Sequence, residues 1–176
     1  MELQRNAEFM RGLGLRDFVA TIPAPPKFLD LPDKLTIDQP YFVVFPGSSR
    51  PGKQWPTVQF GKLLSEVTAQ RGWHAVLCGS GEEYALCAQV IAVAGIEATN
   101  FAGITSLAEL FELIRNAKIL VSNDTSAVHI AAAVGTPSVC ILGGGHYGRF
   151  LPYVIDQANH PLPIPVVRQM DCYKYN

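Results

Sequence analysis

The feature that most constrains the fold of this chain is a polar turn held between two apolar runs. Residues 119–121 are Ile-Leu-Val, and they lead into Ser122-Asn123-Asp124-Thr125 and an alanine-rich stretch that reaches Gly135. A second apolar run follows at 138–142, so the order predicts a strand, a helix and a strand. Unpaired N–H groups and the helix dipole favour an anion at such a turn. In a parallel sheet this is the usual place for a phosphate-bearing ligand.

Further apolar runs extend this pattern into an α/β domain. Strands are predicted at 41–45 and 73–78, and helices at 56–70, 82–94 and 106–116. The strands show no polar alternation and are separated by helices, so the sheet is expected to be parallel and covered on both faces. The predicted fold is a Rossmann-like, doubly wound α/β domain.

This domain is expected to occupy residues 41–153, with less regular segments on either side. Residues 1–40 combine a short amphipathic helix, stopped by Gly-Leu-Gly, with a proline-rich linker. Residues 154–176 form a proline-rich tail with no obvious final element. A domain that opens with a helix and a linker and closes abruptly is expected to be part of a longer protein.

Length and composition limit the function classes. A chain of 176 residues fits one well-buried domain, and its net charge of −1 argues against a nucleic-acid-binding protein. No apolar run approaches the roughly 20 residues that span a bilayer, and the N-terminus lacks the apolar core of a signal peptide. The four cysteines, with Cys78 and Cys140 in apparent core strands, show no zinc-ligand spacing. We expect a cytoplasmic protein with reduced, structural cysteines and no obligatory metal.

The first of three glycine-rich turns follows the strand at 41–45. Its sequence, Gly47-Ser48-Ser49-Arg50-Pro51-Gly52-Lys53-Gln54, nearly matches the P-loop of nucleoside triphosphatases, but Gln54 replaces the hydroxyl that ligates Mg²⁺. Pro56 suits the first position of a helix, which then begins too late to place its dipole on such a phosphate. Lys53 is either a point charge for a phosphate or a solvated surface lysine.

The second turn, at 143–148, matches the dinucleotide-binding pattern G-x-G-x-x-G in its letters. That pattern has to open a helix in the first strand–helix–strand unit, whereas prolines follow here and the turn lies late in the domain. We favour a loop whose backbone approaches a ligand closely, with Gly144 as the contact and Arg149 adding charge, over a plain turn.

The third turn, Gly79-Ser80-Gly81-Glu82-Glu83, places two carboxylates where they bind a ribose diol or only favour the first turn of a helix. Likewise, Asp124 or Thr125 either holds a ligand or caps the following helix, with His129 packed beneath it. Because these turns follow strands of one parallel sheet, they are expected to line a single crevice.

Taken together, these motifs resemble glycosyltransferase family 9, the ADP-heptose:lipopolysaccharide heptosyltransferases. Residues 45–49, Phe-Pro-Gly-Ser-Ser, with 53–56, Lys-Gln-Trp-Pro, are similar to the first motif of that family. Residues 122–137, from Ser-Asn-Asp-Thr-Ser-Ala-Val-His to Gly-Thr-Pro, are similar to its most distinctive motif. The resemblance covers about residues 41–153. It implies the C-terminal, donor-binding half of a GT-B glycosyltransferase, in which two Rossmann-like domains face each other across a cleft.

The resemblance also implies roles for individual residues. Ser48, Ser49 and Lys53 would contact the diphosphate of a nucleotide-sugar donor, and Glu82 or Glu83 would meet its ribose. The rest of the implied binding set is Thr105 beside the adenine and the turn residues that hold the sugar and the phosphates, with a supporting histidine: Asp124, Thr125, Ser126, Ala127 and His129. Lys53 and Asp124 are the catalytic candidates, because charge builds on the leaving diphosphate.

Two departures from the family concern backbone access to the phosphate and the identity of the donor sugar, respectively. Ser126 stands where many members have glycine, and residues 143–149 replace a shorter Gly-Pro-Thr loop. The implied reaction transfers a sugar, with ADP-heptose as the expected donor, to a lipopolysaccharide-type glycan with inversion. The acceptor-binding half, which would supply the general base, is absent from this sequence, so this chain alone is expected to be inactive. A full-length parent that uses lipid-linked acceptors would visit the inner membrane face.

Three other functions stay open from the residues alone. They are a non-catalytic nucleotide-binding module, a P-loop-like nucleoside triphosphatase, and an oligomer scaffold without a ligand. The scaffold leaves three aligned polar turns unexplained.

Overall fold

A parallel sheet organises the part of the chain that the computed structural model describes, residues 1–143, 146–155 and 161–168. Six strands lie in the order β3-β2-β1-β4-β5-β6, and each neighbouring pair is parallel. The strands are β1 (Tyr41–Phe45), β2 (His74–Leu77), β3 (Ala98–Asn100), β4 (Leu120–Asn123), β5 (Ser138–Ile141) and β6 (Ile164–Val166). The predicted doubly wound α/β fold is confirmed.

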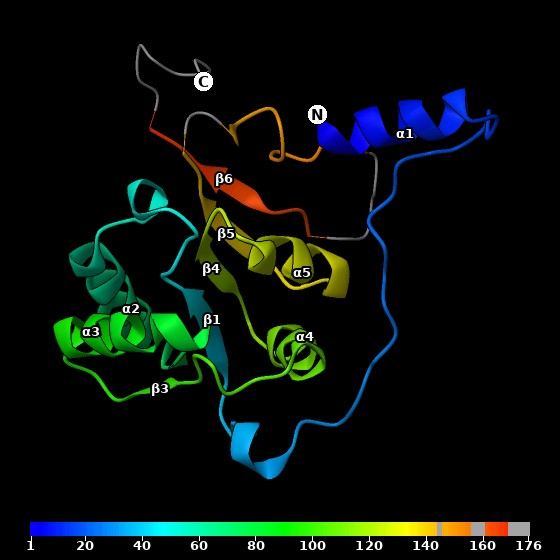
Figure 1. The fold of residues 1–176 in the computed structure, drawn as a ribbon. Coiled ribbons are helices and arrows are strands. Elements are labelled where there is room, and N and C mark those ends of the chain that lie inside the picture. Colours follow the sequence, from blue (N-terminus) through cyan, green and yellow to red (C-terminus); the bar gives the residue numbers. More distant parts are fainter. Residues whose placement is uncertain (144–145, 156–160, 169–176) are drawn as a thin grey trace.

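Helices cover both faces of this sheet (Figure 1). On one face lie α2 (Thr57–Arg71) and α3 (Tyr84–Ala94), and on the other lie α4 (Leu107–Arg115) and α5 (Ser126–Val134). Short 3₁₀ helices include η1 (Asp33–Leu35), η2 (Pro51–Lys53) and η3 (Gly81–Glu83), and α1 (Glu2–Gly12) precedes the domain. α5 ends at Gly135 with φ +81°, a left-handed conformation that a residue with a side chain adopts only at a cost.

Side-chain alternation along β1 divides the core into two apolar layers. Phe42 and Val44 point to the layer under α2 and α3, where they pack with Phe60 and other buried residues. Val43 and Phe45 point to the layer under α4 and α5. Because successive side chains of a strand face opposite sides, a strand buried on both faces has to be apolar throughout, as β1 is.

Two edge strands were not expected from the sequence. β3 has three half-buried residues, and β6 lies at 164–166, inside the tail that was predicted to hold no regular element. That prediction is wrong at β6, which pairs with β5 in parallel register. A proline is tolerated at an edge because one side of an edge strand needs no donor, and Pro165 lies in this strand.

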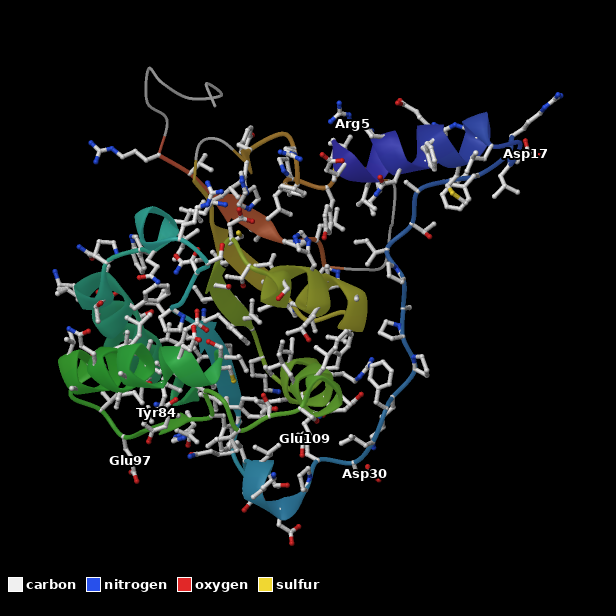
Figure 2. The ribbon with its side chains drawn as sticks, viewed as in Figure 1. Arg5, Asp17, Asp30, Tyr84, Glu97 and Glu109 are labelled. Carbon is white, nitrogen blue, oxygen red and sulfur yellow. The ribbon has the colours of Figure 1, made fainter. Side chains whose placement is uncertain are left out.

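Residues 25–28 of the segment before β1 are bonded to α4. The main-chain N–H of Phe28 donates to Glu112 of α4 at 2.9 Å, and the Phe28 ring meets Phe111 edge to face at 5.2 Å. Arg115 donates to Glu112 at 3.0 Å and to the carbonyl oxygens of Pro25 and Pro26 at 3.1 Å. Figure 2 shows Asp30 of this segment on the same side of the domain as Glu109 of α4. The predicted linker is therefore fixed to the domain surface.

Candidate functional site

A cavity of about 790 Å³ opens at the carboxyl edge of the sheet, where β1, β2, β4 and β5 end. This volume suits a cofactor-sized ligand. The predicted site residues that line it come from four different loops and from α5: Ser48, Ser49, Lys53, Glu83, Thr105, Asp124, Thr125, Ser126 and His129. The expectation that the polar turns face one crevice thus agrees with the cavity lining.

The loop after β1 is held in place by the last residue of β4. Asn123 is fully buried, and its side-chain amide donates to the carbonyl oxygens of Pro46 at 2.7 Å and Gly47 at 3.2 Å. Its amide oxygen accepts from the N–H of Trp55 at 3.0 Å. Asn123 therefore fixes both ends of the loop that carries the two serines and the lysine, before any ligand arrives.

Lys53, His146 and Asp124 form a cluster at the floor of the cavity. The Lys53 ammonium lies 4.0 Å from Asp124 Oδ2 and 3.1 Å from His146 Nε2, and His146 Nδ1 forms a hydrogen bond with Asp124 Oδ2. A neutral imidazole with its proton on Nδ1 satisfies both contacts, because Nδ1–H then donates to the carboxylate and Nε2 accepts from the ammonium. The three side chains come from the loops after β1, β5 and β4.

The turn after β4 caps α5 and lines the cavity at once. Thr125 is the N-cap, and its Oγ1 accepts from the N–H of Ala127 at 3.3 Å. The same oxygen lies 2.8 Å from Ser122 Oγ, which orients it. The sequence left helix capping and ligand binding open for this turn. Thr125 caps the helix, while Ser126 and Asp124 line the cavity.

His129 lies one turn into α5 beneath this cluster. Its Nδ1 forms a hydrogen bond with the hydroxyl of Tyr153, and the two rings stack at 5.8 Å. Burial lowers the pKa of His129, and the nearby Asp124 opposes that shift in part. Burial raises the pKa of Tyr153 to about 12. The pair is therefore neutral at pH 7, and a tyrosine hydroxyl that donates to Nδ1 leaves His129 with an Nε2–H.

Glu83 is placed by hydrogen bonds within its own turn. Its Oε2 accepts from the N–H of Ser80 at 2.7 Å as part of a capping box on η3. The same carboxylate fills the space beside two glycines, since a Cβ on Gly47 would lie 1.8 Å from Oε1 and one on Gly79 2.6 Å from Oε2. Glu83 therefore stabilises the first turn of a helix, one of its two predicted roles, and it also lines the cavity.

Four predicted residues are not among those that line the cavity. Glu82 is exposed on η3, and Ala127 is buried in α5. Arg149 donates to Glu2 of α1 at 2.9 Å and lies over the Phe150 ring, so its charge is engaged at the outer surface. Gly144 lies outside the described residues.

Several lining residues were not proposed from the sequence. His146 and Phe150 come from the loop after β5, and Leu107 and Leu110 come from α4. His146 belongs to the glycine-rich turn for which the sequence predicts ligand contacts by Gly144 and Arg149. Its position directly after a strand is the sequence signal that could have identified it as a cavity residue. The two leucines could not be told from core residues by their spacing.

The two sequence patterns of nucleotide-binding enzymes do not have their usual geometry here. Lys53 ends η2, and α2 begins four residues later at Thr57, so no helix N-terminus adjoins the P-loop-like turn. Residues 146–150, which the structure describes in the loop after β5, contain no α-helix, whereas a dinucleotide fingerprint would open one there. Within the described part of the chain, no cluster of three or more His, Cys, Asp or Glu side chains is arranged to hold a metal ion. No described helix has the length and apolar character needed to cross a bilayer.

A second cavity, of about 650 Å³, lies at the opposite edge of the sheet. It is bounded by the segment at 27–41 and the end of α4. Its buried carboxylate, Glu112, is already paired with Arg115 and with the N–H of Phe28. Its charged groups therefore hold the segment before β1 rather than converge on open space.

Comparison with known proteins gives one consistent result. Residues 24–162 match the model of glycosyltransferase family 9 (heptosyltransferase). Lipopolysaccharide heptosyltransferase 3 of Escherichia coli (strain K12) is 30% identical over 161 residues, which are 86% of this chain and 46% of that protein.

Solved structures share the fold. A glycosyltransferase family 9 protein from Veillonella parvula DSM 2008 superimposes with a TM-score of 0.71 at 18% identity, over 92% of this chain and 47% of that one. The Escherichia coli heptosyltransferase WaaC, solved with ADP-2-deoxy-2-fluoro heptose, gives a TM-score of 0.56 at 23% identity, over 78% of this chain and 38% of that one. The chain thus spans about half the length of these relatives or less.

Proposed function

Because the chain belongs to glycosyltransferase family 9, we propose that it is the donor-binding half of an inverting sugar transferase, with a nucleoside diphosphate sugar in the carboxyl-edge cavity. ADP-heptose is the proposed donor, since a related heptosyltransferase was solved with an ADP-heptose analogue. A lipopolysaccharide-type glycan is the proposed acceptor, because lipopolysaccharide heptosyltransferase 3 is among the relatives.

The observation that carries this proposal is the position of Lys53. Its side chain lines the cavity, and its partners Asp124 and His146 are themselves cavity residues. A diphosphate placed between Lys53, the hydroxyls of Ser48 and Ser49, and the N–H groups at the start of α5 would be surrounded by donors.

The same donors give this half its part in the chemistry. When the bond between the sugar and the diphosphate breaks, negative charge builds on the leaving phosphate oxygens. Fixed donors that already face these oxygens stabilise that charge without reorganising. The base that accepts the proton of the acceptor hydroxyl is proposed to come from a second domain, so this chain binds the donor and prepares the leaving group.

Calorimetric titration of the chain with ADP, UDP, GDP and NAD tests the proposal. We expect saturable binding with preference for ADP. Lys53→Ala should weaken ADP binding about tenfold or more, as loss of a charge-assisted bond does. Lys62→Ala is the matched control, because Lys62 is an exposed lysine of α2 that does not line this cavity.

Other outcomes have distinct meanings. Preference for UDP or GDP would keep the donor-binding role and change the donor nucleotide. Equal loss of binding in the Lys53 and Lys62 variants would mean that the effect is one of net charge. Absence of binding for all four nucleotides would contradict a donor site preformed in this chain.

A further inference from the structure

We propose that His146 is a positioning residue of the donor site, which orients the Asp124 carboxylate to accept hydrogen bonds from hydroxyl groups of the donor sugar. The inference rests on the proposed function, because it concerns the sugar end of the same cavity. It assigns a task to the loop after β5 that Arg149, which is bonded to Glu2, is not placed to perform.

The contacts of Asp124 show how the orientation is achieved. Its side chain is 10% exposed, and Oδ2 accepts from His146 Nδ1 while Lys53 lies 4.0 Å away. Among the residues that the structure describes, none forms a hydrogen bond with Oδ1. One carboxylate oxygen is therefore held by the histidine, and within the described part of the chain no group competes with a ligand for the other.

The order of loops along the sheet places this cluster at the sugar end. Glu83 follows β2, Lys53 follows β1, Asp124 follows β4 and His146 follows β5, and these strands are consecutive neighbours in the sheet. A nucleotide sugar is linear, with its diphosphate between the nucleoside and the sugar. With the ribose near Glu83 and the diphosphate at Lys53, the sugar extends toward the ends of β4 and β5.

Arrival of a diphosphate changes the role of the imidazole. In the structure Nε2 accepts from the Lys53 ammonium at 3.1 Å. A diphosphate is a stronger acceptor for an ammonium than a neutral ring nitrogen, so Lys53 turns to it and Nε2 is released. Nε2 and Asp124 Oδ1 are then two adjacent acceptors, an arrangement that suits neighbouring hydroxyls of a polyol.

The wall next to these acceptors is aromatic. Phe150 lines the cavity and meets the His146 ring at 5.2 Å, edge to face. This contact restricts the imidazole in the orientation that bonds Asp124. An apolar ring face beside two acceptors fits a sugar, which has hydroxyl edges and C–H faces, better than it fits a second phosphate.

Paired titrations with ADP and ADP-heptose separate this role from that of the diphosphate site. We expect the wild-type chain to bind ADP-heptose more tightly than ADP. His146→Ala should lower the affinity for ADP-heptose about tenfold and change that for ADP by less than about threefold. His74→Ala is the control, since His74 of β2 bonds Thr99 of β3 and lies outside the cavity.

Two conservative variants test which ring nitrogen matters. The amide nitrogen of asparagine reaches the position of Nδ1, whereas that of glutamine reaches the position of Nε2. If His146 acts by donating to Asp124, His146→Asn should recover most of the preference for ADP-heptose and His146→Gln should not. If His146 had a merely structural role, the two variants would have the same preference for ADP-heptose. Both would then also show a lowered temperature of thermal unfolding.

The outcomes distinguish this inference from the proposed function. A wild-type chain that binds neither ligand would overturn both. A wild-type chain that binds ADP-heptose, with His146→Ala retaining the full preference over ADP, would overturn the role of His146 alone. Equal recovery by asparagine and glutamine would also reject the Nδ1 assignment.

Discussion

Two cavities of similar volume lie at opposite edges of the sheet, and they use their polar groups in opposite ways. At the amino edge, Glu112 and Arg115 bond to the main chain of the segment before β1, so their charges are committed to the fold. At the carboxyl edge, Lys53, His146 and Asp124 bond chiefly to one another across three loops. A ligand can take over the second set of bonds but not the first. The partners of the charged side chains therefore identify the candidate site better than the volume of the cavity does.

The largest expected effect on stability comes from a substitution at the carboxyl edge of the sheet. Asn123→Ala removes three hydrogen bonds to the loop after β1, and the free energy of unfolding should fall by about 3 kcal/mol at about 1 kcal/mol for each bond. Nucleotide binding should fall with it, because the loop loses its anchor. Urea unfolding and calorimetry measure the two effects.

The neighbouring residue supplies the control. Asp124→Asn keeps the shape of the side chain and leaves an amide oxygen that can accept from His146, so its effect on the free energy of unfolding should stay below about 1 kcal/mol. If Asp124→Asn destabilises the chain as much as Asn123→Ala does, the distinction between a residue that builds the site and one that serves the ligand is wrong.

A second substitution tests the hydrogen bonds at the amino edge of the sheet. Glu112→Gln weakens the bonds to Arg115 and Phe28 at a position that is 1% exposed, and it should lower the free energy of unfolding by about 2 kcal/mol. ADP affinity at a temperature where the variant is folded should not change. Glu66→Gln, an exposed carboxylate of α2, is the matched control. A loss of ADP affinity in Glu112→Gln would show that the two edges are coupled.

A smaller effect depends on pH. Because burial lowers the pKa of His129 below its ordinary value of 6.5, the unfolded chain binds a proton below that pH that the folded chain does not. Stability should therefore fall as the pH drops from about 7.5 to about 5.5. His129→Gln should remove this part of the pH dependence, as urea unfolding at the two pH values would measure. A pH dependence identical to that of the wild type would exclude His129 as its source.

The smallest effect is expected at the outer surface of the carboxyl edge. Arg149 pairs with Glu2 in solvent, and such pairs contribute little, so Arg149→Ala should change the free energy of unfolding by less than about 0.5 kcal/mol. ADP affinity should stay within about twofold of the wild type, because the guanidinium is not in the cavity lining. A tenfold loss in calorimetry would restore Arg149 to the binding set.

The fold was predictable where burial leaves a clear pattern. β1 is apolar at all five positions because both its faces are covered, and the helices between the central strands have their own start and stop residues. The edge strands β3 and β6 have three residues each, none of them buried, so no apolar run marks them. Pairing with a neighbour defines these two strands, and pairing cannot be read from a three-residue segment.

The sequence predicted that these loops line one cavity, but it did not predict the direction of single side chains. Lys53 and Asp124 could be placed in one crevice because each follows a parallel strand. Glu82 and Glu83 are adjacent, and only the geometry of η3 decides that Glu83 faces the cavity. His146 reaches Asp124 across 22 residues, a contact that depends on the path of the loop after β5.

The amide of Asn123 also has a consequence for the order in which the protein is made. Pro46, whose carbonyl oxygen accepts from this amide, is translated 77 residues before Asn123. A nascent chain therefore leaves the ribosome with Lys53 and both serines already synthesised but with their loop unanchored. Only when β4 has emerged and paired beside β1 does the loop acquire its shape, so the cavity at the carboxyl edge is completed late in synthesis.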